Sequence, residues 1–329
     1  MVNVRTAAVI LLIISISLAG CSVSVEVTVQ PDTAIAGSEE TIESTAEVSE
    51  FEELVEPGGV FDPSVPDFFG EGVLPGSEPV PFGSGWFKGG FHSAPVFAPD
   101  GGRVWWGGSY GSEKVYTSRY ADGVWTEQEE VSFSDNIRSY RDPFISPDGL
   151  KLYFISEAPL PGKSADGKEN IWMMEWEEEG WSEPQPLPDV VNSYRLHWTV
   201  SVASNYDLYF AANVDGNPDI FKSDYINGEY TNPVSLGPPI STEQLEFTPN
   251  IAPDQSYLLF SRAMDNTRDP HLYISYADGK GWTEPVRVEN VESCISPIVT
   301  PDRQYVIYLD GPSLLMWRDT SFIEELRSE

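Results

Sequence analysis

The chain has 329 residues, with 19 lysines and arginines against 52 aspartates and glutamates, so its net charge is −33. Nucleic acid and anionic lipid both bind through clustered basic side chains, and this excess of acid excludes them as electrostatic partners. The 27 glycines and 27 prolines are too many for a helical protein and favour short strands joined by turns, while two cysteines exclude a disulfide scaffold.

Residues 1–20 are predicted to be a lipoprotein signal peptide. Arg5 precedes an apolar run from Ala7 to Ala19, which is shorter than the roughly 20 residues of a membrane span. The run ends in Leu-Ala-Gly-Cys at 18–21, which resembles the bacterial lipobox, in which the cysteine thiol receives a diacylglyceryl group. The resemblance implies that Cys21 is lipidated and becomes the mature N-terminus. The alternative is an ordinary signal peptide followed by a chance cysteine.

A lipidated Cys21 implies that the chain is exported and anchored to the cell envelope through lipid alone. Ser22 follows the cysteine, and a residue other than aspartate there usually permits transfer to the outer membrane. We therefore expect the outer membrane or the cell surface rather than the inner membrane.

Residues 21–78 are predicted to be an acidic, largely disordered tether. Between Ser22 and Glu78 there are fourteen acidic residues and no lysine or arginine, and such a chain repels itself and extends. A flexible spacer is the favoured interpretation, and a partner-binding acidic tail is the alternative.

The remainder of the chain repeats one pattern, in which an apolar strand, a turn of the Pro-Asp-Gly type and a second strand ending in an aromatic residue follow one another. The five copies are residues 93–106, 141–154, 197–210, 247–260 and 295–308. Proline fixes φ, aspartate bonds its own backbone and glycine permits a tight exit, so this triplet strongly predicts a turn. In the third copy Ala203, Ser204 and Asn205 replace the triplet, and its turn is the least well defined.

Each copy continues with an alternating strand, a turn of glycine and an aromatic residue, and a strand containing proline. Four strands in about 50 residues is the period of a propeller blade. The fifth copy lacks its fourth strand, and residues 77–82 match that strand. We therefore predict an all-β fold over residues 79–317: a five-bladed β-propeller of four-stranded antiparallel blades, closed by an N-terminal strand that completes the last blade. Residues 318–329 are predicted to be a C-terminal tail.

These repeats resemble the TolB-type, WD40-like β-propeller repeat family, whose pattern is Pro-x-x-Ser-Pro-Asp-Gly, then Leu-Tyr-Phe, Asp-Ile-Tyr and Gly-x-Trp-x-x-Pro. Residues 141–184 match it best, and the resemblance covers residues 79–317. It implies the fold. Because such propellers include binding platforms, envelope scaffolds and some enzymes, it does not select a function.

Candidate ligand-binding residues are expected where the inner strands begin, because propeller ligands usually meet one mouth of the central channel. Repeat alignment places six polar or aromatic residues there, namely His92, Arg141, Asp142, His197, Trp198 and Glu246. An arginine beside aromatic rings would suit an acidic or carbohydrate ligand. The alternative is that these residues only cap backbone groups, or that Arg141 and Asp142 form a local ion pair.

The favoured function is non-catalytic binding of an envelope protein or glycan at this mouth, by a monomer without cofactor or metal. Two histidines with Glu246 could make a metal site, but no two of these residues have a diagnostic spacing. The first alternative is a glycoside hydrolase or polysaccharide lyase using Asp142 and Glu246, since hydrolysis needs two carboxylates. The second is a structural envelope scaffold. Cys294 is expected to be a small buried residue and not a nucleophile.

Overall fold

The structure is a computed structural model of the chain and describes residues 74–83, 86–87, 90–108, 114–131, 133, 139–178, 180–194, 196–214, 216–264, 269–311 and 314–328. The predicted signal peptide, Cys21 and nearly all of the predicted tether lie outside these residues. No helix within the described ranges is long and apolar enough to cross a membrane.

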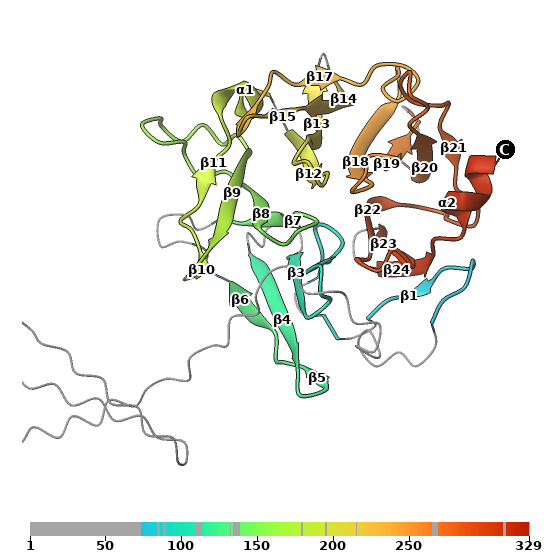
Figure 1. The fold of residues 1–329 in the computed structure, drawn as a ribbon, viewed down its shortest axis with the longest axis horizontal. Helices are drawn as coiled ribbons and strands as arrows, with labels where there is room; N and C mark the ends of the chain where they lie inside the picture. The colour runs from blue at the N-terminus through green and yellow to red at the C-terminus, as the bar shows by residue number, and fades with distance from the viewer. Residues whose placement is uncertain are drawn as a thin grey trace, which may run out of the picture. The chain divides into compact units, whose positions relative to one another are not determined.

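Five β-sheets stand around a central axis (Figure 1), and this confirms the predicted five-bladed propeller. Neighbouring strands in each sheet are antiparallel. From the axis outwards, blade 1 consists of β2 (Val96–Phe97), β3 (Arg103–Gly107), β4 (Val115–Ala121) and β6 (Glu129–Val131), and blade 2 of β7 (Arg141–Ile145), β8 (Lys151–Ser156), β9 (Asn170–Glu177) and β11 (Gln185–Pro186). Blade 3 consists of β12 (Leu196–Val202), β13 (Leu208–Val214), β14 (Asn217–Ser223) and β17 (Val234–Ser235), and blade 4 of β18 (Leu245–Ile251), β19 (Tyr257–Ala263), β20 (Pro270–Tyr276) and β21 (Val286–Arg287). Blade 5 consists of β22 (Ile295–Val299), β23 (Tyr305–Asp310), β24 (Leu314–Asp319) and β1 (Val80–Pro81).

The propeller is closed by its first strand. Figure 1 shows β1 beside β24, with Val80 opposite Trp317 and Pro81 opposite Met316 in an antiparallel pair. The Phe82 N–H donates to the Leu315 carbonyl over 2.9 Å and extends the pairing by one residue. Proline is tolerated here because an edge strand needs no N–H on its outer side. The predicted closure of the last blade is confirmed.

A short hairpin follows the third strand in blades 1, 2 and 3, formed by β5 (Val124–Trp125), β10 (Gly180–Trp181), and β15 (Tyr225–Ile226) with β16 (Glu229–Tyr230). Its glycine, and the equivalent glycine of blade 4, has a positive φ: 81° at Gly123, 128° at Gly180, 87° at Gly228 and 155° at Gly281. Side chains strain this backbone region and glycine does not. The glycine-aromatic turns of the repeat therefore have a backbone cause.

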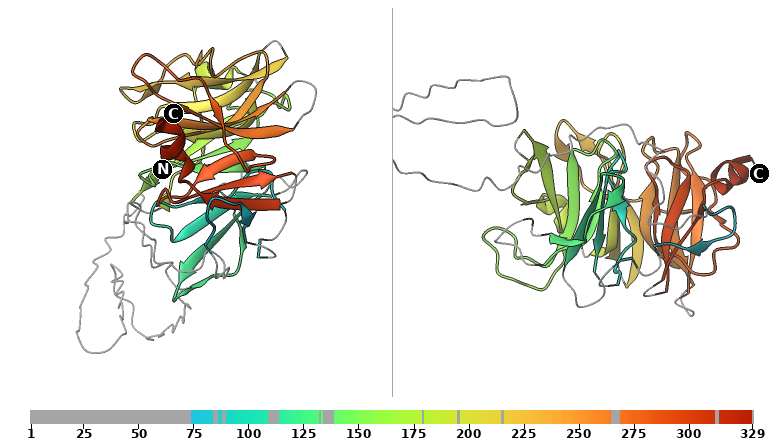
Figure 2. Two further views of the ribbon diagram at one scale, coloured as in Figure 1. Left: turned by 90° about the vertical axis from the view of Figure 1, so that its right-hand side faces the viewer. Right: turned by 90° about the horizontal axis from the view of Figure 1, so that it is seen from below.

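The core lies between the sheets, which stand face to face in the side views of Figure 2. The aromatic residue that ends each sequence repeat is on the second strand of its blade and is at most 2% exposed, as Trp106, Phe154, Phe210, Phe260 and Tyr308 show. Because each blade is covered on both faces, one blade alone could not bury these rings, and the closed ring of blades is the stable unit.

Two short helical segments are present in the described ranges. α1 (Asp189–Asn192) connects blades 2 and 3, while α2 (Phe322–Glu325) and η2 (Leu326–Ser328) follow β24. Phe322 and Ile323 of α2 are buried against the core between blades 4 and 5. The last residues of the chain, expected to be a tail, thus contribute the end of β24 and α2 to the packed structure.

Candidate functional site

In four blades, the pairing of the inner strand with the second strand shifts register near the start of the inner strand. At three of these shifts, the residue that precedes a proline has a left-handed backbone conformation. These residues are Asp142, Thr248 and Ser296, with φ of 47°, 48° and 55°, and all three are buried. The Ser296 N–H donates to Thr248 Oγ1 over 3.1 Å, and the Ala94 N–H donates to Ser296 Oγ over 3.2 Å. Neighbouring blades are therefore hydrogen-bonded to each other at these strand starts.

The structure brings two of the predicted site residues, His92 and Asp142, into contact. His92 Nδ1 lies 2.8 Å from Asp142 Oδ1, across the boundary between blades 1 and 2. Burial lowers the pKa of His92, but the charge and hydrogen bond of Asp142 outweigh it, and the pKa is raised from its ordinary value of 6.5. The carboxylate thus favours the imidazolium form.

Arg141 lies beside this pair and interacts with carboxylates of its own blade. Its Nη1 donates to Glu169 Oε1 over 2.7 Å, and its Nη2 lies 3.2 Å from Glu157 Oε1. The charges of Arg141 and Glu169 act in opposite directions on the pKa of His92. The start of β7 is consequently a cluster of charged groups, in which the guanidinium already has two carboxylate partners.

Glu246 belongs to a different cluster. It is fully buried in β18 and accepts hydrogen bonds from Arg262 Nε over 2.9 Å and Thr242 Oγ1 over 2.7 Å. The Arg262 guanidinium also donates to the carbonyls of Pro239 and Ile240. This is a satisfied buried ion pair within blade 4.

The other two predicted residues, His197 and Trp198, are on β12, and their side chains lie outside the described part of the structure. Across the described ranges, no three side chains of histidine, cysteine, aspartate or glutamate gather as a metal site would require. Ligand binding by the six predicted residues stays a prediction.

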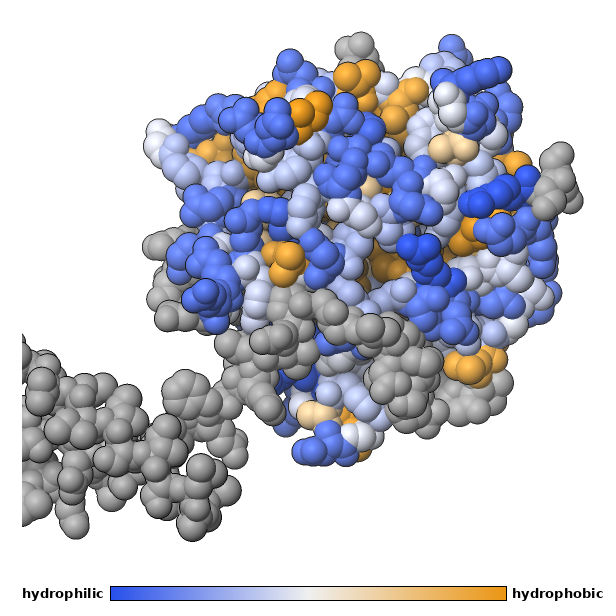
Figure 3. Space-filling view, viewed as in Figure 1, coloured by the Kyte–Doolittle hydropathy of each residue, from blue (hydrophilic) through white to orange (hydrophobic). Residues whose placement is uncertain are grey.

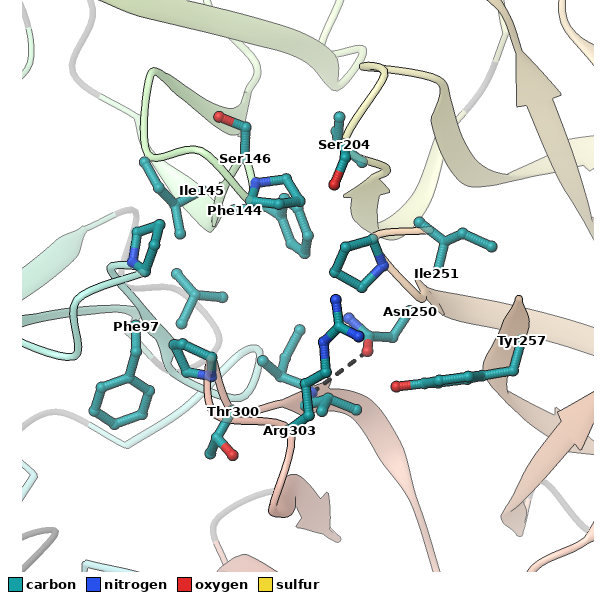
Figure 4. A pocket seen from close by; sticks show the side chains of 18 residues that line it. Phe97, Phe144, Ile145, Ser146, Ser204, Asn250, Ile251, Tyr257, Thr300 and Arg303 are labelled. Atoms are coloured by element: carbon teal, nitrogen blue, oxygen red, sulfur yellow. Dashed lines mark hydrogen bonds between the residues drawn. The ribbon is translucent and has the colours of Figure 1, made fainter. Parts of the chain in front are cut away.

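A pocket of about 350 Å³ lies at the opposite ends of the inner strands (Figure 4). Every blade contributes the end of its inner strand and the following turn to its wall, through Phe97 and Pro99, Ile145 and Pro147, Val202 and Ser204, Ile251 and Pro253, and Val299 and Pro301. None of the four predicted residues whose side chains the structure describes, His92, Arg141, Asp142 and Glu246, lines it. Figure 3 shows a mostly hydrophilic face with apolar residues visible in a hollow near its middle.

The pocket lining is poor in ionisable groups. Its 18 residues include Tyr257 and Arg303 but no aspartate, glutamate, histidine, lysine or cysteine. Burial raises the pKa of Tyr257 to about 12, although the Arg303 charge opposes the shift. Among the described residues, no acidic side chain lines this wall, and the one full charge on it is positive.

Sequence reasoning missed these pocket residues, although one signal was available. The repeat predicts glycine after Pro301-Asp302, and Arg303 stands in that place. Glycine fits this turn position best, so a long cationic side chain there breaks the local rule of the repeat. Such exceptions are expected at functional positions.

No protein-family profile matches the chain, and no curated protein matches it. Several solved structures are similar to the chain over part of its length. TolB from Acinetobacter baumannii is 15% identical over 69% of this chain, with a TM-score of 0.46, and the match spans 54% of that protein. A gluconolactonase from Xanthomonas campestris is 15% identical over 68% of this chain and 70% of its own, with a TM-score of 0.46. An oligogalacturonate lyase from Vibrio parahaemolyticus is 15% identical over 67% of this chain and 58% of its own, with a TM-score of 0.40. At this level of similarity, these proteins decide nothing about the activity of the chain.

Proposed function

We propose that this protein is a non-catalytic binding module of the bacterial cell envelope. In this proposal it is exported, anchored to the outer membrane or the cell surface through lipidated Cys21, and holds an envelope protein or glycan at a mouth of its central channel. The anchor follows from the Leu-Ala-Gly-Cys motif at 18–21. It predicts that Cys21→Ser moves the chain from the membrane fraction to the soluble fraction.

The observation that carries the binding function is the composition of the pocket wall. Cleavage of a glycan needs a general acid and a base or nucleophile, supplied in most hydrolases by two carboxylates. Among the 18 lining residues there is neither a carboxylate nor an imidazole, and Tyr257, with a pKa of about 12, is a poor base at neutral pH. The wall offers a concave apolar surface with a few polar groups, which suits binding.

The hydrolase or lyase alternative would use Asp142 and Glu246. Both carboxylates are buried, one is hydrogen-bonded to His92 and the other is paired with Arg262. Neither is one of the residues that line the pocket. These contacts favour structural roles for the two carboxylates and support binding over catalysis.

The experiment uses the full-length chain, purified in non-ionic detergent and immobilised. Solubilised envelope proteins and envelope polysaccharides are offered separately to the wild type and to two variants. Ser204→Trp places an indole at the exposed rim of the pocket, whereas Gln304→Trp adds the same group at an exposed position that does not line it. We expect one class of ligand to be retained by the wild type and Gln304→Trp, and retention to fall at least about tenfold in Ser204→Trp.

Two results would contradict the proposal. Polysaccharide recovered with a shorter chain length or new unsaturated ends, after incubation with the wild type, would make the protein an enzyme. Equal retention by Ser204→Trp and the wild type would place binding away from the pocket, as the scaffold alternative predicts.

A further inference from the structure

The inner strand of each blade ends in a tight turn whose third residue is left-handed. The φ values are 75° at Gly101, 75° at Gly149, 66° at Tyr206, 59° at Gln255 and 60° at Arg303. Glycine adopts this conformation without strain, and other residues do so at a cost. Blades 3, 4 and 5 thus have a side chain at a position where glycine would avoid backbone strain. We expect the contacts of each side chain to offset that strain.

Tyr206 and Gln255 do so by joining their blade to the preceding one. The Tyr206 hydroxyl donates to the carboxylate of Asp148 in the turn of blade 2. Gln255 Nε2 donates to Asn205 Oδ1 over 3.2 Å in the turn of blade 3. Both side chains therefore act as links between successive turns.

Arg303 makes no such link. Its guanidinium forms no hydrogen bond or ion pair with any residue that the structure describes, and in Figure 4 it extends over the pocket. The equivalent partner would be Asp254, whose Oδ1 accepts hydrogen bonds from the backbone and hydroxyl of Ser256 over 3.1 Å and 2.7 Å. A guanidinium without a partner among the described residues, at the rim of a pocket whose described lining has no carboxylate, is available to a ligand.

Two further donors face the same space. Asn250 Oδ1 accepts a hydrogen bond from the Val299 N–H over 3.4 Å, which leaves its Nδ2 group without a partner among the described residues and directed to the pocket. The Ser204 hydroxyl is exposed and points into the pocket in Figure 4. Arg303, Asn250 and Ser204 come from blades 5, 4 and 3, so hydrogen-bond donors lie along one side of the wall.

The other side of the wall is apolar. Blades 1 and 2 contribute Val96, Phe97, Phe144 and Ile145. The one hydroxyl on this side, that of Ser146, is engaged because it donates to Asp148 Oδ1 over 2.6 Å. The pocket is therefore divided into a donor-bearing half and a hydrocarbon half.

We infer that the central pocket takes an organic monocarboxylate, with its carboxylate held by Arg303, Asn250 and Ser204 and its hydrocarbon body against the wall of blades 1 and 2. The inference rests on the proposed function, since it names the chemical group that the same pocket recognises. The forked guanidinium matches a carboxylate in charge and geometry. A single guanidinium would neutralise only one of the two charges of a dianionic phosphate. A cationic ligand would be repelled by the guanidinium.

The test compares 2-naphthoate with its neutral analogue 2-naphthamide, by calorimetric titration of the full-length chain in non-ionic detergent. We expect the wild type to bind naphthoate at least about tenfold more tightly than naphthamide. Arg303→Gln places at this turn the residue that blade 4 already has there, so the turn should form. It should remove the preference for naphthoate while leaving naphthamide affinity within about twofold.

Asp254→Asn gives a result of opposite sign. The pKa of Asp254 is lowered first by the Ser256 hydroxyl and further by the Arg303 charge, so the two charges attract one another. Removing the carboxylate should raise naphthoate affinity by about two- to threefold, whereas a purely structural role for Arg303 predicts no gain. Arg287→Gln, on the outer strand β21, is the matched control and should change neither affinity.

Equal affinity of the wild type for naphthoate and naphthamide, or no naphthoate binding at millimolar concentration, would overturn the inference. Tighter binding of 2-naphthyl phosphate than of naphthoate would also overturn it, in favour of a phosphate site. If naphthoate is preferred but Ser204→Trp still retains the envelope ligand, the proposed function fails and this inference stands. If Ser204→Trp releases the envelope ligand but naphthoate is not preferred, the inference fails and the proposed function stands.

Discussion

His92 and Asp142 join blades 1 and 2 through a hydrogen bond of 2.8 Å between side chains that are 10% and 1% exposed. At the equivalent position, the start of the inner strand, a hydrogen bond between Thr248 and Ser296 joins blades 4 and 5, and one between Ser296 and Ala94 joins blades 5 and 1. The contact between blades 1 and 2 differs from these two because both of its side chains can carry a charge. A titratable joint makes the stability of the propeller dependent on pH.

The expected pH dependence follows from the raised pKa of His92. Burial opposes protonation, but the Asp142 charge and hydrogen bond prevail, so the folded protein binds the proton more tightly than the unfolded chain. The stabilisation is then complete below the unfolded pKa of about 6.5 and is lost as the pH rises through the raised folded value. We expect the free energy of unfolding of the wild type to exceed that of His92→Gln by more at pH 6 than at pH 9, measured by urea denaturation.

Asp142→Asn provides the companion variant, since it keeps the shape and removes the charge that favours the imidazolium. It should show the same reduced dependence on pH as His92→Gln. Parallel stability curves for the wild type and both variants between pH 6 and pH 9 would show that the joint does not titrate as the structure implies.

The fold could be predicted because its information is local and repeated. Pro99, Pro147, Pro253 and Pro301 mark four turns by their spacing alone, and the Glu-Pro-Val segment at 78–80 matched the missing outer strand. The third turn forms without the triplet, because the Tyr206 N–H donates to the Ala203 carbonyl over 2.9 Å. Strand alternation and turn chemistry suffice for such features.

The candidate site could not be predicted in the same way, because its chemistry depends on contacts between blades. His92 lies 50 residues before Asp142, and alignment of repeats does not say which partners meet. Nor does the sequence specify whether the pocket lies at the starts or at the ends of the five inner strands. The availability of Arg303 is visible only by comparison with Tyr206 and Gln255, whose side chains are bonded.

Glu246→Gln should destabilise the protein without any role in catalysis. The substitution keeps the size of the side chain but leaves the Arg262 guanidinium, which is 11% exposed, without its counter-charge. Breaking a buried ion pair in this way costs about 3–5 kcal/mol. The free energy of unfolding in urea measures the loss.

Glu130→Gln is the control for this variant. Glu130 pairs with Lys114, and both side chains are about half exposed, so water screens the pair and the loss should be small beside that of Glu246→Gln. The double variant Glu246→Leu with Arg262→Met should recover part of the stability, because it removes both buried charges together. A single variant Glu246→Gln as stable as the wild type would return Glu246 to the list of candidate functional groups.

Cys294 should be inert to alkylation in the native protein. It is 0% exposed, and burial raises its pKa well above the ordinary value for a thiol, although a hydrogen bond with Ser261 opposes the shift. Since the thiolate is the reactive form, iodoacetamide at pH 8 should modify Cys294 only after denaturant is added, as followed by mass spectrometry. Rapid modification of the native chain would mean that the start of β22 opens readily.

The closure of the propeller can be tested with a disulfide between β1 and β24. Pro81 and Met316 are directly opposite, and the neighbouring Phe82 N–H is bonded to the Leu315 carbonyl, so the 81–316 pair is the closer, non-hydrogen-bonded type. We expect Pro81→Cys with Met316→Cys to form a disulfide under mild oxidation. The oxidised protein should be more stable than its reduced form by about 2–4 kcal/mol, because the bond constrains nearly the whole propeller.

Val80→Cys with Met316→Cys is the register control, since adjacent residues of a strand point to opposite faces of the sheet and its two sulfurs should not meet. The buried Cys294 is too enclosed to exchange with either pair. A bond that forms in both double variants would show that β1 slides on β24. A bond that forms only at Val80 would place the strand one residue out of register. A bond at Pro81 that leaves the unfolding midpoint unchanged would show that the ring opens elsewhere, because closing the weakest joint of a ring is what raises its stability.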